Sequence, residues 1–372
     1  MPDSTSFLST RARALNESSP YAPYLRAHFE RVEQAHSSER PNGYVGLCVA
    51  ENRLLWPDLS ARVARTSPPP PTALGYDAMV GAMSFRERLA SFLGERVFGR
   101  PVKPENLAAL AGAGAVLELL FFALGDPGDG VLVPTPSYAG FWPDLEARDG
   151  LRIVTVPTSS GEDFRLTPEQ LDRALAAADR PIRALLFTTP DNPLGRVYTR
   201  AEVQAVLDWA DSNGLHVVFD EVYALSVFGS TPFTSAASLG KALGDRVHIV
   251  WAFSKDFGAS GLRCGVLLSE NEDVLQTVNQ LSYWAACSGQ TQHTLGEIVA
   301  DTAWVEAYIQ KLQQTLRTGS EDLSTRLNQH GIPFIPSDSG IFVVLDLRRY
   351  LREPTFEGEA ELWQRLMDNA NL

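Results

Sequence analysis

The sequence predicts an α/β fold, with one large domain on a mainly parallel β-sheet and one smaller α+β domain. The chain has 372 residues, enough for two hydrophobic cores of unequal size. From about residue 105, short apolar runs alternate with amphipathic stretches, which is typical of strands covered by helices on both faces. After about residue 290 this alternation gives way to one long helical stretch.

The central region supplies the strands and helices of the large domain, which we expect to span residues 41–290. Apolar runs predict strands at 131–133, 151–156, 184–188, 216–219, 247–253 and 265–268. Amphipathic periodicity predicts helices at 115–124, 199–213 and 273–285.

The two ends of the chain are expected to form the small domain. Residues 1–40 predict an irregular arm with a helix over 21–35, and residues 67–71 (SPPPP) predict an extended connector, because proline lacks the amide donor. Residues 291–372 would form the small domain, completed by the N-terminal segment. A helix over 304–329, a strand over 341–347 and a helix from 359 are expected there.

Composition excludes several kinds of partner. A formal net charge of −13 disfavours nucleic acid, whose phosphates favour a basic surface. Cys48, Cys264 and Cys287 are widely spaced and give neither a metal pattern nor a disulfide framework. The polar N-terminus and the lack of an apolar run of about 18 residues predict no signal peptide and no membrane span. We therefore expect a cytoplasmic protein with no metal.

Charged residues follow two of the predicted strands, at the edge where open α/β sheets bind ligands. Lys255 follows the strand at 247–253, and Arg263 comes eight residues later. A partly desolvated lysine suits covalent attachment to a carbonyl, and an arginine can hold a phosphate. Asp220 ends the strand at 216–219, where a buried carboxylate needs a cation. Taken singly, Lys255 could be a surface lysine and Asp220 a helix cap.

Two irregular turns complete the pattern. Residues 188–195 (TTPDNPLG) fix a turn that carries Asn192. Residues 111–115 (AGAGA) open a helix, whose first amides can cradle a phosphate. Each turn alone is weak evidence.

Together and in this order, these signals resemble the fold-type I enzymes that use pyridoxal 5′-phosphate (PLP), in particular the class I/II aminotransferases. Within that group the chain is similar to the 1-aminocyclopropane-1-carboxylate (ACC) synthase branch. The resemblance covers residues from about 40 to 370. It is carried by 49–54 (VAENRL), 126–129 (DPGD), 134–138 (PTPSY), 192–195 (NPLG), 220–223 (DEVY), 254–258 (SKDFG) and 288–292 (SGQTQ).

The resemblance implies a seven-stranded type of sheet, a homodimer and catalytic roles for three residues. Lys255 would hold the cofactor as an internal aldimine and shuttle a proton, Asp220 would pair with the pyridine nitrogen, and Tyr138 would stack on the ring. Asn192 and Tyr223 would bond the ring's phenolate oxygen. Tyr138 could instead be core packing.

The resemblance also implies a phosphate site and a substrate site. The phosphate site would comprise Ala113, Gly114, Ser254, Arg263 and, from the other subunit, Tyr76. Glu51, Tyr76 and Asn192 would lie near the substrate, although Glu51 could also be a solvated or capping carboxylate.

The chain departs from the family pattern in three places. Gly114 replaces a small hydroxyl residue, and Ala252 replaces a serine. We expect these losses to weaken PLP retention by about 1–3 kcal/mol. The family's C-terminal arginine, which clamps the substrate carboxylate, has no match before Leu372. Either the sequence is truncated or another group serves, with Arg53 and the backbone near Ser339-Gly340 as candidates.

Three functions are compatible with these residues. The first is an aminotransferase acting on an amino acid through an external aldimine and a Cα carbanion. The second is an ACC-synthase-like lyase, cyclase or γ-replacement enzyme acting on S-adenosylmethionine or another γ-activated amino acid. The third is a non-catalytic binding protein with the PLP fold.

Overall fold

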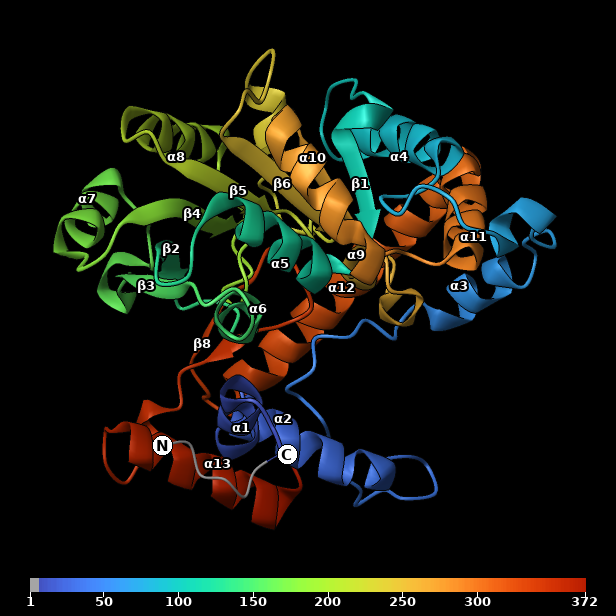
Figure 1. Cartoon of the computed structure of the whole chain (residues 1–372). Coiled ribbons are helices and arrows are strands. Elements are labelled where there is room, and N and C mark those ends of the chain that lie inside the picture. The colour runs from blue at the N-terminus through green and yellow to red at the C-terminus, as the bar shows by residue number, and fades with distance from the viewer. Residues whose placement is uncertain (1–6) are drawn as a thin grey trace.

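A seven-stranded β-sheet forms the centre of the protein (Figure 1). The computed structural model describes residues 7–372, so residues 1–6 of the predicted N-terminal arm lie outside the described part. The strand order across the sheet is β1-β7-β6-β5-β4-β2-β3. The strands are β1 (Leu107–Leu110), β2 (Gly130–Thr135), β3 (Arg152–Pro157), β4 (Ile182–Thr188), β5 (His216–Asp220), β6 (Val247–Ala252) and β7 (Gly265–Ser269).

The prediction of an α/β fold with a mainly parallel sheet is confirmed. β2 to β6 run parallel to their neighbours within that group, whereas β7 is antiparallel to both β1 and β6. All six strands predicted for the large domain form. β1 was missed, because its four residues, Leu-Ala-Ala-Leu, are too short and too rich in alanine to show a strand pattern.

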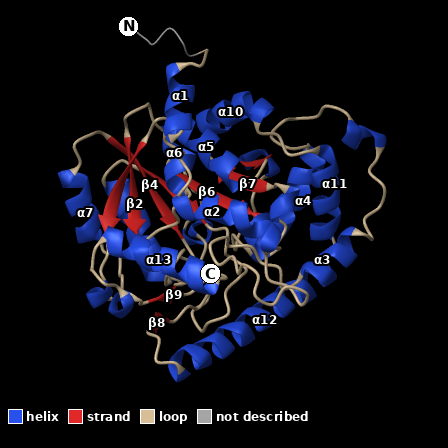
Figure 2. Cartoon of the chain, turned by 90° about the horizontal axis from the view of Figure 1, so that it is seen from below, coloured by secondary structure: helices blue, strands red, loops and turns tan. Residues whose placement is uncertain are grey.

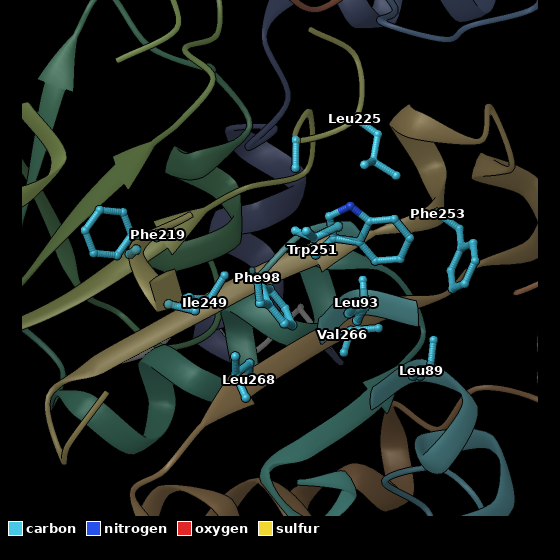
Figure 3. Close-up of a cluster of buried hydrophobic side chains, with 14 of the residues drawn as sticks. Leu89, Leu93, Phe98, Phe219, Leu225, Ile249, Trp251, Phe253, Val266 and Leu268 are labelled. Atoms are coloured by element: carbon cyan, nitrogen blue, oxygen red, sulfur yellow. The ribbon is translucent and has the colours of Figure 1, made fainter. Parts of the chain in front are cut away.

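Helices cover both faces of the sheet. The helices that contribute to the two buried clusters against these faces are α3 (Trp56–Val63), α4 (Met83–Arg96), α5 (Ala113–Leu124), α6 (Phe141–Glu146), α7 (Pro168–Ala177), α8 (Arg200–Ser212), α9 (Phe253–Asp256), α10 (Glu272–Leu281), α11 (Gly289–Ala300) and α12 (Thr302–Gln329). Alternate residues of β6 point to opposite faces, as a strand requires: Ile249 and Trp251 belong to one cluster and Val250 to the other. Figure 3 shows Trp251 near Leu93 and Val266 in the larger cluster.

Two predicted segments near the N-terminus need correction. A further helix, α1 (Thr10–Glu17), precedes α2 (Pro23–Arg31), and the Ser9 side chain caps it by accepting from the Ala12 amide. The proline block is extended only as far as Pro70. Pro71 begins a short 3₁₀ helix over Pro71–Leu74, because proline is well tolerated in a first helical turn.

The segment that contains α2 packs with the C-terminal end of the chain beside the sheet (Figures 1 and 2). The C-terminal helix α13 (Phe356–Ala370) lies near α2, and Arg31 of α2 forms an ion pair of 4.0 Å with Asp368 of α13. The Val45 amide donates to the Asn371 carbonyl (2.8 Å), and Arg31 donates to the Met367 carbonyl (3.4 Å). The small lobe therefore joins the N-terminal segment to the C-terminal helix.

The predicted strand over 341–347 is largely wrong. Only β9 (Val344–Leu345) forms, paired with β8 (Phe334–Ile335). The preceding residues turn towards the large sheet, where Phe342 packs edge-to-face on Tyr223 with the ring centroids 5.1 Å apart. They therefore have no neighbouring strand with which to pair.

α11 and the first half of α12 pack with the large domain. Leu295 and Ile298 of α11, and Val305, Leu312 and Leu316 of α12, belong to the larger buried cluster. We therefore propose that the large domain extends beyond residue 290 into α12. Within residues 7–372, neither α12 nor any other helix has the length and apolarity needed to cross a membrane.

The packing of α12 predicts a difference between two leucines of that helix. Leu312→Ala should lower the free energy of unfolding by about 2–5 kcal/mol, because Leu312 is fully buried and its removal leaves a cavity. Leu323→Ala, on the exposed part of the same helix, should change it by about 0.5 kcal/mol or less. Urea unfolding followed by circular dichroism measures both. Equal, small effects would show that α12 does not pack on the core.

Candidate active site

The carboxyl ends of β4, β5 and β6 bring the predicted residues to one edge of the sheet. Thr188 at the end of β4 pairs with Asp220 at the end of β5, and Asp220 pairs in turn with Val250 of β6. β6 ends at Ala252, and α9 places Lys255 just beyond this edge. The parallel register thus aligns the ends of three strands that are far apart in sequence.

Lys255 is largely buried at this edge. Its Nζ donates a hydrogen bond to the Ala50 carbonyl (2.7 Å). Burial lowers the pKa of Lys255, and the positive charge of Arg263 adds to this effect. Asp220 and Glu51 oppose it, so both carboxyls interact electrostatically with the lysine.

Asp220 lies almost wholly inside the protein, with 7% of its surface exposed. Burial raises its pKa to about 7, and a hydrogen bond from the Val222 amide (3.3 Å) and the charge of Lys255 only partly counter this. A buried carboxyl with so few partners is suited to pair with a cationic group of a ligand.

Tyr138 and Tyr223 flank Asp220. Burial raises the pKa of Tyr138 to about 12, with contributions from Asp144 and Asp220. The Tyr138 ring lies so close to Gly140 that a β-carbon there would come within 2.2 Å of it. The Tyr223 hydroxyl is buried and has no hydrogen-bond partner within residues 7–372. Since buried polar atoms are nearly always paired, this hydroxyl is free to bond a ligand.

The N-terminus of α5 and Arg263 form an anion cradle. Gly112 precedes α5 with φ +100, and no side chain caps the first amides of the helix, at Ala113 and beyond. Arg263 donates to the carbonyls of Ser260 (3.1 Å) and Ala111 (3.3 Å). A β-carbon at Gly112 would lie 2.5 Å from Arg263 Nη2, so only glycine permits this approach.

The two departures from the family pattern lie in different surroundings. A β-carbon at Gly114 would lie 3.4 Å from Asp144 Oδ1, an ordinary van der Waals distance, so the structure does not explain why a hydroxyl residue is missing there. Burial raises the pKa of Asp144 to about 6, with a contribution from Glu118. Ala252 is buried in a small apolar cluster with Val222 and Tyr223.

Glu51 reaches the same region from the loop before α3. Its carboxylate accepts from Ser260 Oγ (2.8 Å) and from Arg53 Nε (2.8 Å). Burial works to raise the pKa of Glu51, but these hydrogen bonds together lower it, with smaller contributions from the charges of Arg53 and Lys255. Sequence reasoning missed Ser260 and Asp144, because nothing in their local sequence marks them.

Tyr76 is the predicted site residue that the structure does not bring to Lys255. It is 95% exposed and lines a hollow of about 660 Å³ with Tyr283 and His293. Asn192 follows β4, and its side chain has no hydrogen-bond partner in the described chain. Ser254 is buried next to Lys255.

Part of the Ser339-Gly340 segment is already occupied by hydrogen bonds within the protein. The Gly340 amide donates to the Ser226 carbonyl (3.0 Å), and Ser339 Oγ donates to the Gly195 carbonyl (3.1 Å). The suggestion that the Gly340 amide replaces the missing arginine and binds the substrate carboxylate is therefore wrong. Arg53 remains a candidate.

This fold and this site define a member of the PLP-dependent aminotransferases. The model of the family "Aminotransferase class I and II" matches residues 43–372. The chain therefore belongs to this family, and its cofactor is PLP, as the sequence resemblance implied.

Relatives within the family place the chain near the ACC synthase branch. It is 33% identical to 1-aminocyclopropane-1-carboxylate synthase 7 of Arabidopsis thaliana, over 96% of this chain and 84% of that protein. It is 35% identical to human 1-aminocyclopropane-1-carboxylate synthase-like protein 1, over 99% of this chain and 76% of that protein. The fold matches aspartate aminotransferase from Thermus thermophilus with maleate, with a TM-score of 0.80, 22% identity and coverage of 98% and 90% of the two chains.

The residues at the site fit PLP. The cradle between α5 and Arg263 suits a phosphate, the buried Asp220 suits a pyridinium nitrogen, and the unpaired Tyr223 hydroxyl suits the ring oxygen. Lys255, whose pKa responds to both Asp220 and Arg263, would supply the amine that joins the aldehyde. Each part of the cofactor thus has a complementary group.

The approach of Arg263 to Gly112 predicts a specific loss of cofactor affinity. Gly112→Ala should weaken PLP binding by about 10- to 100-fold, because the new methyl group displaces a charged donor from the cradle. After the cofactor has been removed, titration of the apoprotein with PLP measures the effect by absorbance. Gly261→Ala, where a β-carbon meets open space, is the control and should bind PLP as before. Equal affinities for the two variants would contradict this placement of Arg263.

Proposed function

We propose that this protein is an aminotransferase that moves an amino group from an amino acid to a 2-oxo acid. The observation that supports this function is the placement of Lys255 and Asp220 at one edge of the sheet, where each acts on the charge of the other. When bound, PLP supplies an aldehyde that joins to amines and a ring that withdraws electrons from the bonds at Cα.

Lys255 would hold the cofactor and then carry a proton. Burial lowers its pKa, so that more of the released amine is uncharged and can accept the Cα proton at Nζ. In transamination, Nζ would deliver that proton to the carbon on the cofactor side of the substrate nitrogen. The Ala50 carbonyl, which accepts from Nζ, would orient the amine when it is not attached.

Asp220 would keep a proton on the ring nitrogen. In a site with so little water, a pyridinium ion and a carboxylate stabilise each other, and the protonated ring accepts electrons more readily. Tyr223 and Asn192 would bond the ring oxygen, and Tyr138 would cover the ring face. Together these side chains orient the ring relative to Lys255.

The phosphate would bind at the start of α5. The uncapped amides at Ala113 and Gly114 donate hydrogen bonds, and the helix dipole favours an anion there. Arg263 adds a charged donor and Ser254 a hydroxyl. This anchor would keep the cofactor in place while Lys255 is detached.

We also propose a homodimer. Tyr76, Tyr283 and Trp284 are large and exposed, and the two tyrosines line one hollow with Met79. Exposed apolar groups gathered in this way are typical of an interface. In such a dimer, Tyr76 of one subunit would reach the phosphate site of the other.

A second candidate is a lyase, cyclase or γ-replacement enzyme acting on S-adenosylmethionine or another γ-activated amino acid. The names of the plant relatives favour it, as does the presence of Glu51 near Lys255. A mouse relative, 35% identical, carries the name "Probable inactive 1-aminocyclopropane-1-carboxylate synthase-like protein 2", so a non-catalytic binding protein is the third candidate.

The dependence on an oxo acid separates these functions. Addition of an amino acid alone to the holoenzyme should convert the cofactor to its amino form in a single turnover, seen as a loss of visible absorbance. A 2-oxo acid should restore the absorbance and permit continued turnover. Lys255→Ala should reduce the rate by at least about 10²-fold, because it lacks the proton carrier, whereas the exposed Lys241→Ala should react normally.

Other outcomes would select another candidate. Continued turnover of S-adenosylmethionine without an oxo acid would replace the proposed reaction by the lyase. A holoenzyme whose spectrum no amino acid alters would support the non-catalytic binding protein.

A further inference from the structure

Glu51 is the only carboxylate besides Asp220 that acts on the charge of Lys255 in the described chain, and both its oxygens are occupied. Oε1 accepts from Ser260 Oγ (2.8 Å). Oε2 lies 2.8 Å from both Nε and Nη2 of Arg53. An unpaired carboxylate here would attract a cationic substrate group, but Arg53 already neutralises it.

The Arg53 guanidinium is held on a second side by an aromatic ring. Its central carbon lies 5.2 Å from the centroid of the Trp56 ring, and the Trp56 indole donates to the Gly258 carbonyl (2.9 Å). A cation over an indole face is stabilised by the ring's negative potential. The carboxylate and the ring therefore both restrain the Arg53 guanidinium.

Arg53 still has donors to offer. Its side chain is 63% exposed, whereas that of Glu51 is 22% exposed. Nη1 of Arg53 has no hydrogen-bond partner among residues 7–372. An arginine with one edge on a carboxylate and the other edge open can bind a second anion.

This pair lies beside the reactive amine. The Ala50 carbonyl, one residue before Glu51, accepts the hydrogen bond from Lys255 Nζ. Ser260, which holds Glu51, also accepts from Arg263 through its carbonyl. A substrate bound beside Lys255 would therefore face a neutralised carboxylate and an exposed cation.

We propose that Arg53 sets the charge class of the substrate. By pairing with Glu51 it disfavours amino acids with a cationic side chain, including the sulfonium of S-adenosylmethionine. Its open edge favours amino acids whose side chain ends in a carboxylate. This inference rests on the proposed function and narrows it to dicarboxylic and neutral amino acids.

The test is a double-mutant cycle with Arg53→Gln, Glu51→Gln and the double variant. Dissociation constants of the holoenzymes for glutamate, methionine and S-methylmethionine come from changes in the visible spectrum. Arg53→Gln should weaken the binding of glutamate about three- to tenfold, as expected for a partly exposed charge. It should strengthen the binding of S-methylmethionine, a sulfonium, by a similar factor. Methionine, whose side chain is neutral, is the control, and its dissociation constant should stay within about twofold. An equal loss of affinity for methionine and glutamate would show that Arg53 binds the α-carboxylate instead, and would overturn the proposal. In the Glu51→Gln background, Arg53→Gln should strengthen the binding of S-methylmethionine less, because no carboxylate is left to attract the sulfonium.

Succinate gives a readout that is independent of the cofactor's chemistry. It has two carboxylates and no amine, so its binding can be measured by calorimetry, and Arg53→Gln should weaken it about three- to tenfold. Unchanged succinate binding would overturn the role proposed for Arg53 and leave the proposed function untouched. An unchanged ratio between the dissociation constants of glutamate and S-methylmethionine would do the same. If succinate binding weakens as expected but no amino acid changes any spectrum, the proposed function fails and the anion site at Arg53 stands.

Discussion

The burial of the Asp220 carboxyl beside the Lys255 amine is the constraint on which the rest of the site depends. Two ionisable groups in a region of low dielectric constant are costly unless each has a partner. Here burial moves their pKa values towards each other, since it raises that of Asp220 and lowers that of Lys255. A ring that offers a cationic nitrogen to one and an aldehyde to the other satisfies both groups.

The sheet makes this arrangement possible. β4, β5 and β6 are buried on both faces, and their parallel register places the ends of these three strands side by side. The tightly packed side chains around Trp251 fix β6, and therefore α9 and Lys255, relative to β5 (Figure 3). The loop before α3 then closes the site, because the Ala50 carbonyl binds Lys255 and Glu51 binds Ser260. Asp220 and Lys255 thus lie at the ends of packed strands, whereas Arg263 and Arg53 are exposed.

Much of the fold could be predicted from the sequence. The apolar runs that end in Asp220 and precede Lys255 are bounded by helices, so their pattern predicts both strands. The same pattern predicts the edge of the sheet at which the two residues lie. The sequence does not predict β1, because two of its four residues are alanine, which has a low preference for strands. The strand expected over 341–347 is mostly absent because Phe342 packs on Tyr223, a tertiary contact that no local pattern shows. The contact between Glu51 and Ser260 spans 209 positions and the one between Gly114 and Asp144 joins two helices, so neither could be predicted without the structure.

The attachment of the cofactor to Lys255 is the most direct test of the central claim. The chain has four lysines, at positions 103, 241, 255 and 311, so the modified residue can be identified without ambiguity. Reduction of the holoenzyme with borohydride, followed by peptide mass spectrometry, should find the phosphopyridoxyl group on Lys255 alone. A modified peptide that carries Lys103, Lys241 or Lys311 in its place, or no modified peptide at all, would contradict the proposed site.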